Sequence, residues 1–97
     1  MNEKLIRSKL VNVISKENWY KCSYKKSNEL LKKKLYEEIN ELKETDFKDI
    51  NEYADVLEVL YELIERNDLT RTEVEKVRIK KKLQKGGFDE IVLKDKK

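Results

Sequence analysis

The sequence predicts a small all-α protein, a single domain spanning residues 1–97 and built as a bundle of about four helices. The chain has no proline and only two glycines, which favours long helices over a sheet with many turns. Apolar residues recur at helical spacing in several segments. Hydrophobic residues make up 38% of the chain and charged residues 44%, so little apolar material remains for the interior of a monomer. We therefore expect the bundle to complete its core by self-association.

The first helix is expected at residues 4–16, where apolar side chains follow helical spacing: Ile6, Leu10, Val13 and Ile14. Arg7 and Lys9 lie beside this stripe, where surface charge is the simplest interpretation. The helical period breaks over residues 17–26, an interval that holds three aromatic residues around Cys22: Trp19, Tyr20 and Tyr24. We expect this loop to pack its rings on the bundle, although such rings can also stack on a nucleobase.

A second helix is expected from Ser27 or Asn28, both suitable N-cap residues, to about Lys43. Its apolar face consists of Leu31, Leu35, Ile39 and Leu42. With about 100° of rotation per residue, Glu38 falls close beside that face. An ionised carboxylate there is costly unless it is paired or binds a metal. Two interpretations of Glu38 stay open, a salt bridge to a lysine of another helix and a metal ligand.

A third helix follows a short turn and runs from about Phe47 or Ile50 to Asn67. It carries two apolar stripes, one of Ile50, Tyr53, Leu57, Leu60 and Ile64 and one of Val56, Val59 and Leu63. A helix that is apolar nearly all round is buried on several sides. In so small a protein, this pattern indicates a central helix that contacts both its own chain and a partner subunit.

A fourth helix is expected to begin at the capping box formed by Thr70 and Glu73 and to end at Gly86-Gly87. It is rich in basic residues, namely Lys76, Arg78, Lys80, Lys81, Lys82 and Lys85. These residues form either a solubilising surface or a phosphate-binding one. Beyond the glycines, an apolar segment (Phe88, Ile91, Val92 and Leu93) must dock against another surface.

The second and third helices each carry two carboxylates three residues apart, Glu38 with Glu41 and Glu52 with Asp55. Residues at this spacing lie on one side of a helix, with their Cβ atoms about 5–6 Å apart. If the two helices fold back on each other, the four carboxylates converge. Mg²⁺ takes oxygen ligands in octahedral geometry and keeps waters that phosphates can replace. We therefore expect a Mg²⁺ site between these helices.

The net charge of +3 conceals an uneven distribution along the chain. Residues 29–65 contain twelve acidic and five basic residues, a balance of −7, whereas residues 76–97 contain nine basic and three acidic residues, a balance of +6. An acidic middle and a basic end suit a site that holds cations and polyanions side by side. An ordinary charged helical surface is the alternative interpretation.

Several classes of site are excluded by composition. Cys22 is the only cysteine, so neither an internal disulfide nor a cysteine-based metal site is possible. Histidine is absent, which removes the usual general base and zinc ligand and leaves carboxylates for any metal site. No apolar run approaches the length of a membrane span, and the N-terminus lacks a signal-peptide pattern. We expect a cytoplasmic protein.

The two acidic segments and both chain ends resemble a known family, the all-α nucleoside triphosphate pyrophosphohydrolases of the MazG-like superfamily. That family's hallmark is E-E-x-x-E followed by E-x-x-D on the next helix, matched here by Glu37-Glu38-Ile-Asn-Glu41 and Glu52-Tyr-Ala-Asp55. Its small, single-domain house-cleaning members begin with K-L-V-R-D-K-I and end with R-G-G-F. This chain is similar at Lys4-Leu-Ile-Arg7-Ser8-Lys9-Leu and at Lys85-Gly86-Gly87-Phe88. It departs from the pattern at Ser8 and Lys85, which replace aspartate and arginine.

The resemblance implies Mg²⁺-dependent hydrolysis of a nucleoside triphosphate between the α- and β-phosphates, giving a monophosphate and pyrophosphate, with Mn²⁺ able to substitute. The metal ligands it implies are Glu38, Glu41, Glu52 and Asp55. Glu37 and Glu38 would be the catalytic carboxylates, with Glu37 orienting the attacking water or binding a further ion. Candidates to bind the substrate phosphates are Arg7, Lys9, Lys81 and Lys85. Family members are homodimers or dimers of dimers.

The sequence is also compatible with two other functions. The chain could be a catalytically silent nucleotide-binding or sensing protein of the same fold. A nucleic-acid-binding module that uses the basic end is a weaker hypothesis, because the acidic middle would repel phosphates in the absence of metal. The expected partners are a nucleoside triphosphate and a second copy of the chain. We do not expect the protein to bind a membrane or a nucleic acid.

Overall fold

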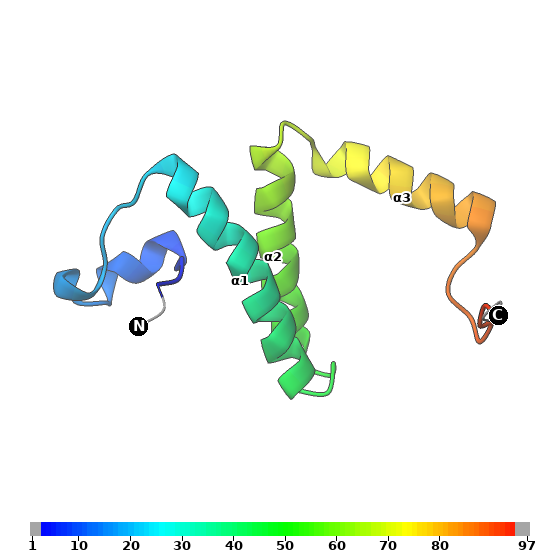
Figure 1. Ribbon diagram of the computed structural model, residues 1–97, viewed down its shortest axis with the longest axis horizontal. Helices are drawn as coiled ribbons and strands as arrows, with labels where there is room; N and C mark the ends of the chain where they lie inside the picture. The colour runs from blue at the N-terminus through cyan, green and yellow to red at the C-terminus, as the bar shows by residue number, and fades with distance from the viewer. Residues whose placement is uncertain (1–2, 95–97) are drawn as a thin grey trace.

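The computed structural model describes residues 3–94, and this part of the chain is all-helical with no strand. Three α-helices follow one another as α1 (Tyr24–Glu44), α2 (Ile50–Arg66) and α3 (Arg71–Lys85). Helices α1 and α2 lie side by side as an antiparallel pair, and α3 projects away from the end of α2 (Figure 1). The all-α prediction is confirmed, but the described residues form three α-helices rather than about four.

The helix expected at residues 4–16 does not form. This segment instead contains two short 3-10 helices, Ser8–Asn12 and Lys16–Asn18, joined by irregular chain. Three β-branched residues (Val11, Val13 and Ile14) and two polar residues that compete for backbone hydrogen bonds (Asn12 and Ser15) lower the helix propensity here. The helical spacing of the apolar residues therefore did not predict the structure of this segment correctly.

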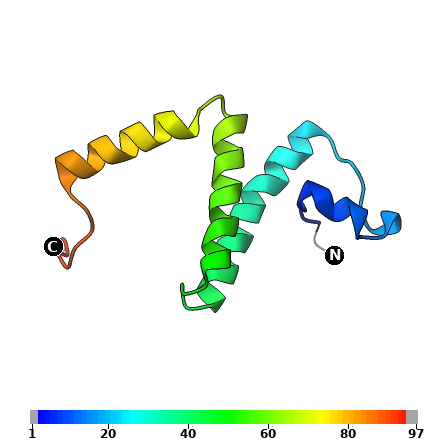
Figure 2. The ribbon, with the colours of Figure 1, turned by 180° about the vertical axis from the view of Figure 1, so that it is seen from behind.

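The aromatic loop packs less closely than expected. Trp19 is half-buried, but Tyr20 is 56% exposed and Tyr24 is 63% exposed. The Tyr20 hydroxyl donates a 2.7 Å hydrogen bond to Glu3 and accepts one of 2.6 Å from the Lys26 ammonium group. These contacts attach the N-terminal segment to the start of α1, beside the α1–α2 pair (Figure 2).

Helix α1 begins earlier than predicted because Ser23, rather than Ser27 or Asn28, is its N-cap. The Ser23 hydroxyl accepts a 3.1 Å hydrogen bond from the Lys26 backbone N–H. After α1, Asp46 and Phe47 adopt left-handed backbone conformations that reverse the chain. The Asp49 carboxylate then accepts a 2.8 Å hydrogen bond from the Asn51 backbone N–H and begins α2.

The interface between α1 and α2 contains the core. The buried apolar residues of the described chain are Leu31, Leu42 and Val59, and Glu38 is buried with them at 6% exposure. Ile39, expected on the apolar face of α1, is instead 40% exposed. At the other end of the pair, the Arg66 guanidinium donates hydrogen bonds to Ser27 and Asn28 of α1. The hairpin is therefore held by a short apolar strip and by polar contacts at one end.

Helix α2 has apolar residues on two sides, as predicted. Val59 packs against α1, while the other stripe faces solvent, with exposed fractions of 79% at Ile50 and 45% at Leu57. The contact of this second stripe with a partner subunit stays a prediction. No helix within residues 3–94 combines the length and the apolar character needed to cross a bilayer.

Helix α3 has the capping box that its sequence predicts. The Thr70 hydroxyl accepts a hydrogen bond from the Glu73 backbone N–H, and the Glu73 carboxylate accepts one from the Thr70 N–H. Gly86 ends the helix at a φ of 81°, which is strained for any residue with a side chain. Every residue from 71 to 94 is exposed.

Candidate metal centre

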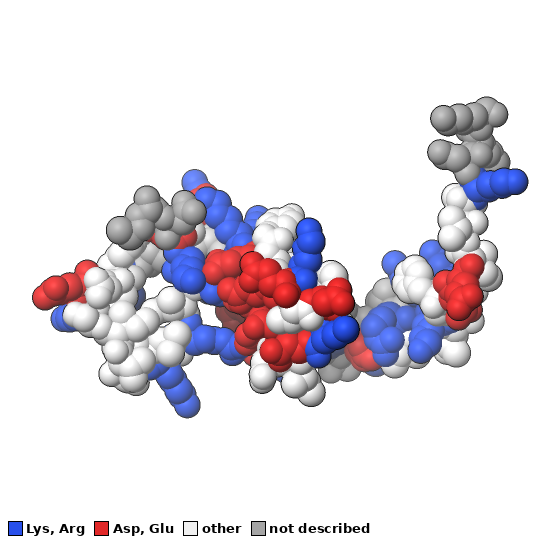
Figure 3. Space-filling view, turned by 90° about the horizontal axis from the view of Figure 1, so that it is seen from below, with Lys and Arg blue, Asp and Glu red and all other residues white. Residues whose placement is uncertain are grey.

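The α1–α2 pair holds a cluster of three carboxylates near its connecting turn, Glu38 and Glu41 from α1 and Glu52 from α2. One oxygen of each lies within 4.8 Å of the others. Figure 3 shows acidic side chains gathered at the middle of the molecule, while lysine and arginine side chains line the projecting arm. The convergence expected from the helical spacing is therefore present for three of the four carboxylates.

Glu38 is the most deeply placed of the three. Its Oε1 lies 3.3 Å from the ammonium nitrogen of Lys34, one turn earlier on the same helix. Its Oε2 is buried and has no hydrogen-bond partner in the described structure. The lysine pairing anticipated for Glu38 is thus present, within α1 rather than between helices, and it satisfies only one of the two oxygens.

Glu52 faces Glu38 from α2 and has a similar environment. Its Oε2 is also buried without a hydrogen-bond partner. Two buried, unpartnered carboxylate oxygens on neighbouring helices are costly for the folded chain. A cation between them would remove that cost, and an all-carboxylate set is the kind of donor set that Mg²⁺ prefers. The residues present therefore fit a hard divalent cation.

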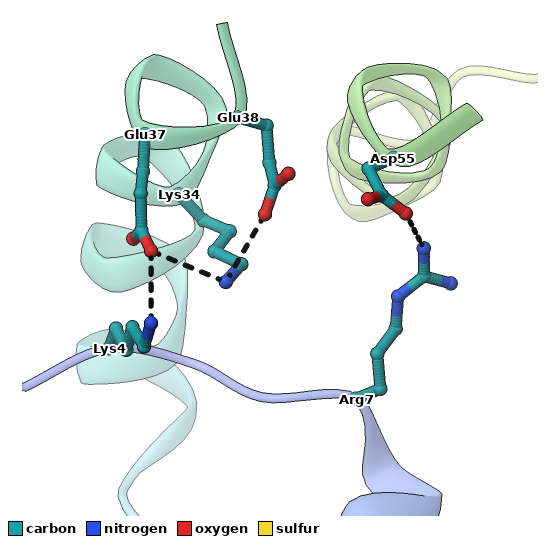
Figure 4. Close-up of polar contacts among 6 residues, drawn as sticks. All are labelled: Lys4, Arg7, Lys34, Glu37, Glu38 and Asp55. Carbon is teal, nitrogen blue, oxygen red and sulfur yellow. Dashed lines mark hydrogen bonds and ion pairs between the residues drawn. The ribbon is translucent and has the colours of Figure 1, made fainter. Parts of the chain in front are cut away.

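The N-terminal segment crosses beside this cluster and pairs with the remaining acidic residues (Figure 4). Asp55, expected as the fourth ligand, instead accepts a 2.8 Å hydrogen bond from the Arg7 guanidinium. Glu37 lies 3.3 Å from the Lys4 ammonium group and 3.7 Å from that of Lys34. Asp55 and Glu37 thus line the edge of the cluster and already have basic partners.

The crowding of these carboxylates changes their acidity. Burial raises the pKa of the Glu38 carboxyl and the charge of Glu41 adds to the rise, although Lys34 opposes both. Loss of hydration also raises the pKa of Glu52, and the charges of Asp55, Glu38 and Asp49 raise it further. Both groups therefore favour a proton, or another cation, more strongly in the folded chain than in the unfolded one.

This shift predicts how the stability of the metal-free protein depends on pH. A carboxyl with a raised pKa binds more protons in the folded state, so its contribution to stability falls as the pH rises above its ordinary value of 4.5. The double variant Glu38→Gln, Glu52→Gln lacks this penalty. Its stability advantage over the wild type should grow between that pH and neutrality, as measured by urea unfolding with a chelator present. The exposed pair Glu44→Gln, Glu58→Gln is the control, and an advantage independent of pH would contradict the prediction.

The four predicted phosphate-binding residues lie in three different places. Arg7 is at the edge of the acidic cluster, and Lys9 is exposed in the first 3-10 helix. Lys81 and Lys85 are exposed on α3, which points away from the α1–α2 pair (Figure 1). Of these four residues, Arg7 is the one that lies beside the acidic cluster of its own chain. The role of all four in binding phosphate stays a prediction.

Two basic residues near the cluster were not anticipated from the sequence. Lys34 precedes Glu38 by four residues, a spacing at which side chains on a helix meet, so this pair could have been found from the pattern. Lys4 pairs with Glu37 across 33 positions of the chain, and no local pattern reveals such a contact.

Comparison with protein-family models, with curated proteins and with solved structures gave no match for this chain.

Proposed function

We propose that the protein is a Mg²⁺-dependent nucleoside triphosphate pyrophosphohydrolase of the MazG-like type, which cleaves between the α- and β-phosphates. The observation that supports this function best is the buried Glu38 carboxylate. Its Oε2 is buried without a hydrogen-bond partner, and the residue belongs to an acidic cluster drawn from two helices. This cluster contains the carboxylates that the sequence resemblance assigns to the metal, except Asp55, which lies beside it.

The balance of charge supports a divalent ion in particular. The three carboxylates of the cluster, Glu38, Glu41 and Glu52, and the neighbouring Asp55 carry four negative charges when ionised. Lys34 and Arg7 contribute two positive charges through their contacts with Glu38 and Asp55. The remaining charge of about −2 is what one Mg²⁺ would neutralise.

In the proposed reaction, a bound Mg²⁺ would neutralise the phosphate oxygens and lower the pKa of a coordinated water. Glu38, Glu41 and Glu52 would hold the ion, and the short apolar core between α1 and α2 fixes the positions of these residues. Glu37, at the edge of the cluster, is suited to orient the attacking water. The Arg7 guanidinium keeps 57% of its side-chain surface exposed and can pair with a substrate phosphate. Arg7 would then exchange Asp55 for the phosphate.

The alternative is a nucleotide-binding protein of the same fold without hydrolytic activity. It is favoured by the basic partners that Glu38, Glu37 and Asp55 already have. Those contacts would weaken metal binding and leave the water poorly activated. The two functions differ in turnover and agree in predicting that nucleotides bind.

The test is incubation with a panel of ribo- and deoxyribonucleoside triphosphates and Mg²⁺, with separate assays for pyrophosphate and for orthophosphate. The proposed function predicts equal amounts of monophosphate and pyrophosphate from at least one substrate, and loss of both when a chelator is added. Tight nucleotide binding without product would select the alternative. Release of orthophosphate alone would contradict cleavage between the α- and β-phosphates.

Self-association is the second part of the proposal. The accessible surface of the chain is 9321 Å², whereas a compact monomer of 11.7 kDa has about 5,900 Å². The radius of gyration is 17.6 Å, compared with about 12–13 Å for a compact domain of this length. A chain with so much exposed surface, much of it apolar, favours a homodimer or a dimer of dimers.

A further inference from the structure

Helix α3 and residues 86–94 are exposed along their whole length and are not covered by any other part of residues 3–94. Apolar residues there are strongly exposed, with 83% at Leu83 and 108% at Phe88. A helix of 15 residues is marginally stable on its own in water, so α3 needs a surface to pack on. Helix α3 points away from its own α1–α2 pair, so the pair does not provide that surface (Figure 2).

An exposed apolar stripe on α2 leads to the α2–α3 junction. On α2, the exposed stripe comprises Ile50, Tyr53, Leu57 and Leu60. At Ile64 it reaches a groove of about 370 Å³ at the α2–α3 junction, lined by the apolar or aromatic residues Tyr61, Ile64, Val74 and Ile79 and by the polar residues Arg71, Thr72, Glu75 and Lys76. Since the stripe and the groove are contiguous, a partner that packs on α2 also contacts the base of α3.

The charges of the arm and of the body are complementary. Helix α3 contains seven basic and two acidic residues, whereas each α1–α2 pair carries the acidic cluster near its connecting turn. Figure 3 shows these two regions separated within one molecule. A second copy of the chain offers both an apolar stripe to match that of α2 and an acidic surface to match α3.

We infer that two copies associate through their α2 stripes and that α3 of each lies across the α1–α2 pair of the other. This arrangement brings Lys81 and Lys85 to the acidic cluster of the partner, where they can bind substrate phosphates that their own cluster does not reach. The inference rests on the proposed function for the role of these lysines, but the arrangement itself does not. The surface in excess of a compact monomer, about 3,400 Å² per chain, is well above the roughly 800 Å² per partner of a stable interface.

The first test concerns assembly alone. Light scattering coupled to size exclusion should give twice the chain mass for the wild type and the chain mass for Leu57→Arg. Val13→Arg introduces the same charge at a position that is 78% exposed in the N-terminal segment and should remain dimeric. A monomeric wild type, or a dimer that survives Leu57→Arg, would overturn the proposed interface.

The second test asks which chain α3 covers, without using activity. In a Cys22→Ser background, chains carrying Lys81→Cys are mixed with chains carrying Glu41→Cys and treated with a short bis-maleimide. A covalent heterodimer is expected from this pair, and none from Lys81→Cys with Lys9→Cys. Equal cross-linking of both pairs, or intramolecular cross-linking of a chain carrying Lys81→Cys and Glu41→Cys together, would exclude the crossed arrangement.

The third test adds the chemistry. One chain carries Glu38→Gln, the other carries both Lys81→Gln and Lys85→Gln, and two affinity tags allow the heterodimer to be purified. If the lysines act across the interface, the altered lysines face the altered acidic cluster, so one site carries all three substitutions. The other site then combines an unaltered cluster with unaltered lysines and is intact. The heterodimer should then have about half the wild-type activity, although each parent homodimer is inactive. An inactive heterodimer beside an active wild type would reject the shared site. An inactive wild type would instead remove the proposed function, and the cross-linking result would still decide the arrangement.

Discussion

Replacing Glu38 with glutamine is expected to lower kcat/KM for triphosphate hydrolysis by about 10²–10³-fold. The amide keeps the size of the side chain but removes the charge of the most deeply buried carboxylate in the acidic cluster. Steady-state kinetics at saturating and at limiting Mg²⁺ measure the loss. Because a buried charge disappears, the metal-free variant should unfold no more easily than the wild type, so lost activity would not reflect a lost fold.

The matched control for that experiment is Glu44→Gln. Glu44 lies on the same helix but is exposed and belongs to no ion pair of the described structure. It should retain wild-type kinetics. Equal activities of Glu38→Gln and Glu44→Gln would contradict the assignment of Glu38 to the metal.

Replacing Leu42 with alanine is expected to cost about 2–5 kcal/mol of stability, which is a large part of the total for a small domain. Leu42 is 7% exposed and is one of three buried apolar residues in the part of the chain that the structure describes. Its loss should lower Tm by at least about 8 °C and weaken metal binding, because the α1–α2 pair positions the carboxylates. Thermal unfolding and Mn²⁺ titration measure the two effects.

The control for Leu42 is Val13→Ala. Val13 is 78% exposed, so its truncation should change stability by no more than about 0.5 kcal/mol. A small effect at Leu42, comparable with that at Val13, would mean that the hairpin core does not determine the stability of the fold.

Features that depend on a few neighbouring residues were predicted well from the sequence. The capping box at Thr70 and the unusual position of Glu38 are both local patterns, and the structure contains both. The two apolar sides of α2 were also evident, because a stripe depends only on spacing along one helix. Local patterns of this kind need no knowledge of the rest of the fold.

Features that depend on competition or on distant contacts were predicted less well. The 3-10 helices at the N-terminus replaced an expected α-helix, since β-branched and polar residues outweighed the apolar spacing. The contact of Arg7 with Asp55 spans 48 positions, so no local pattern reveals that this expected metal ligand also has a basic partner. The position of α3, which separates Lys81 and Lys85 from their own acidic cluster, depends on the junction after α2 and not on any pattern within α3.

The central claim is that a divalent cation, rather than basic side chains alone, balances the carboxylates between α1 and α2. Crystals grown with Mn²⁺ and measured for anomalous scattering test it directly. The expected result is a metal peak within coordination distance of Glu38, Glu41 and Glu52. The contradictory result is no peak between these helices, with Lys34 and Arg7 as the only cations that face the cluster.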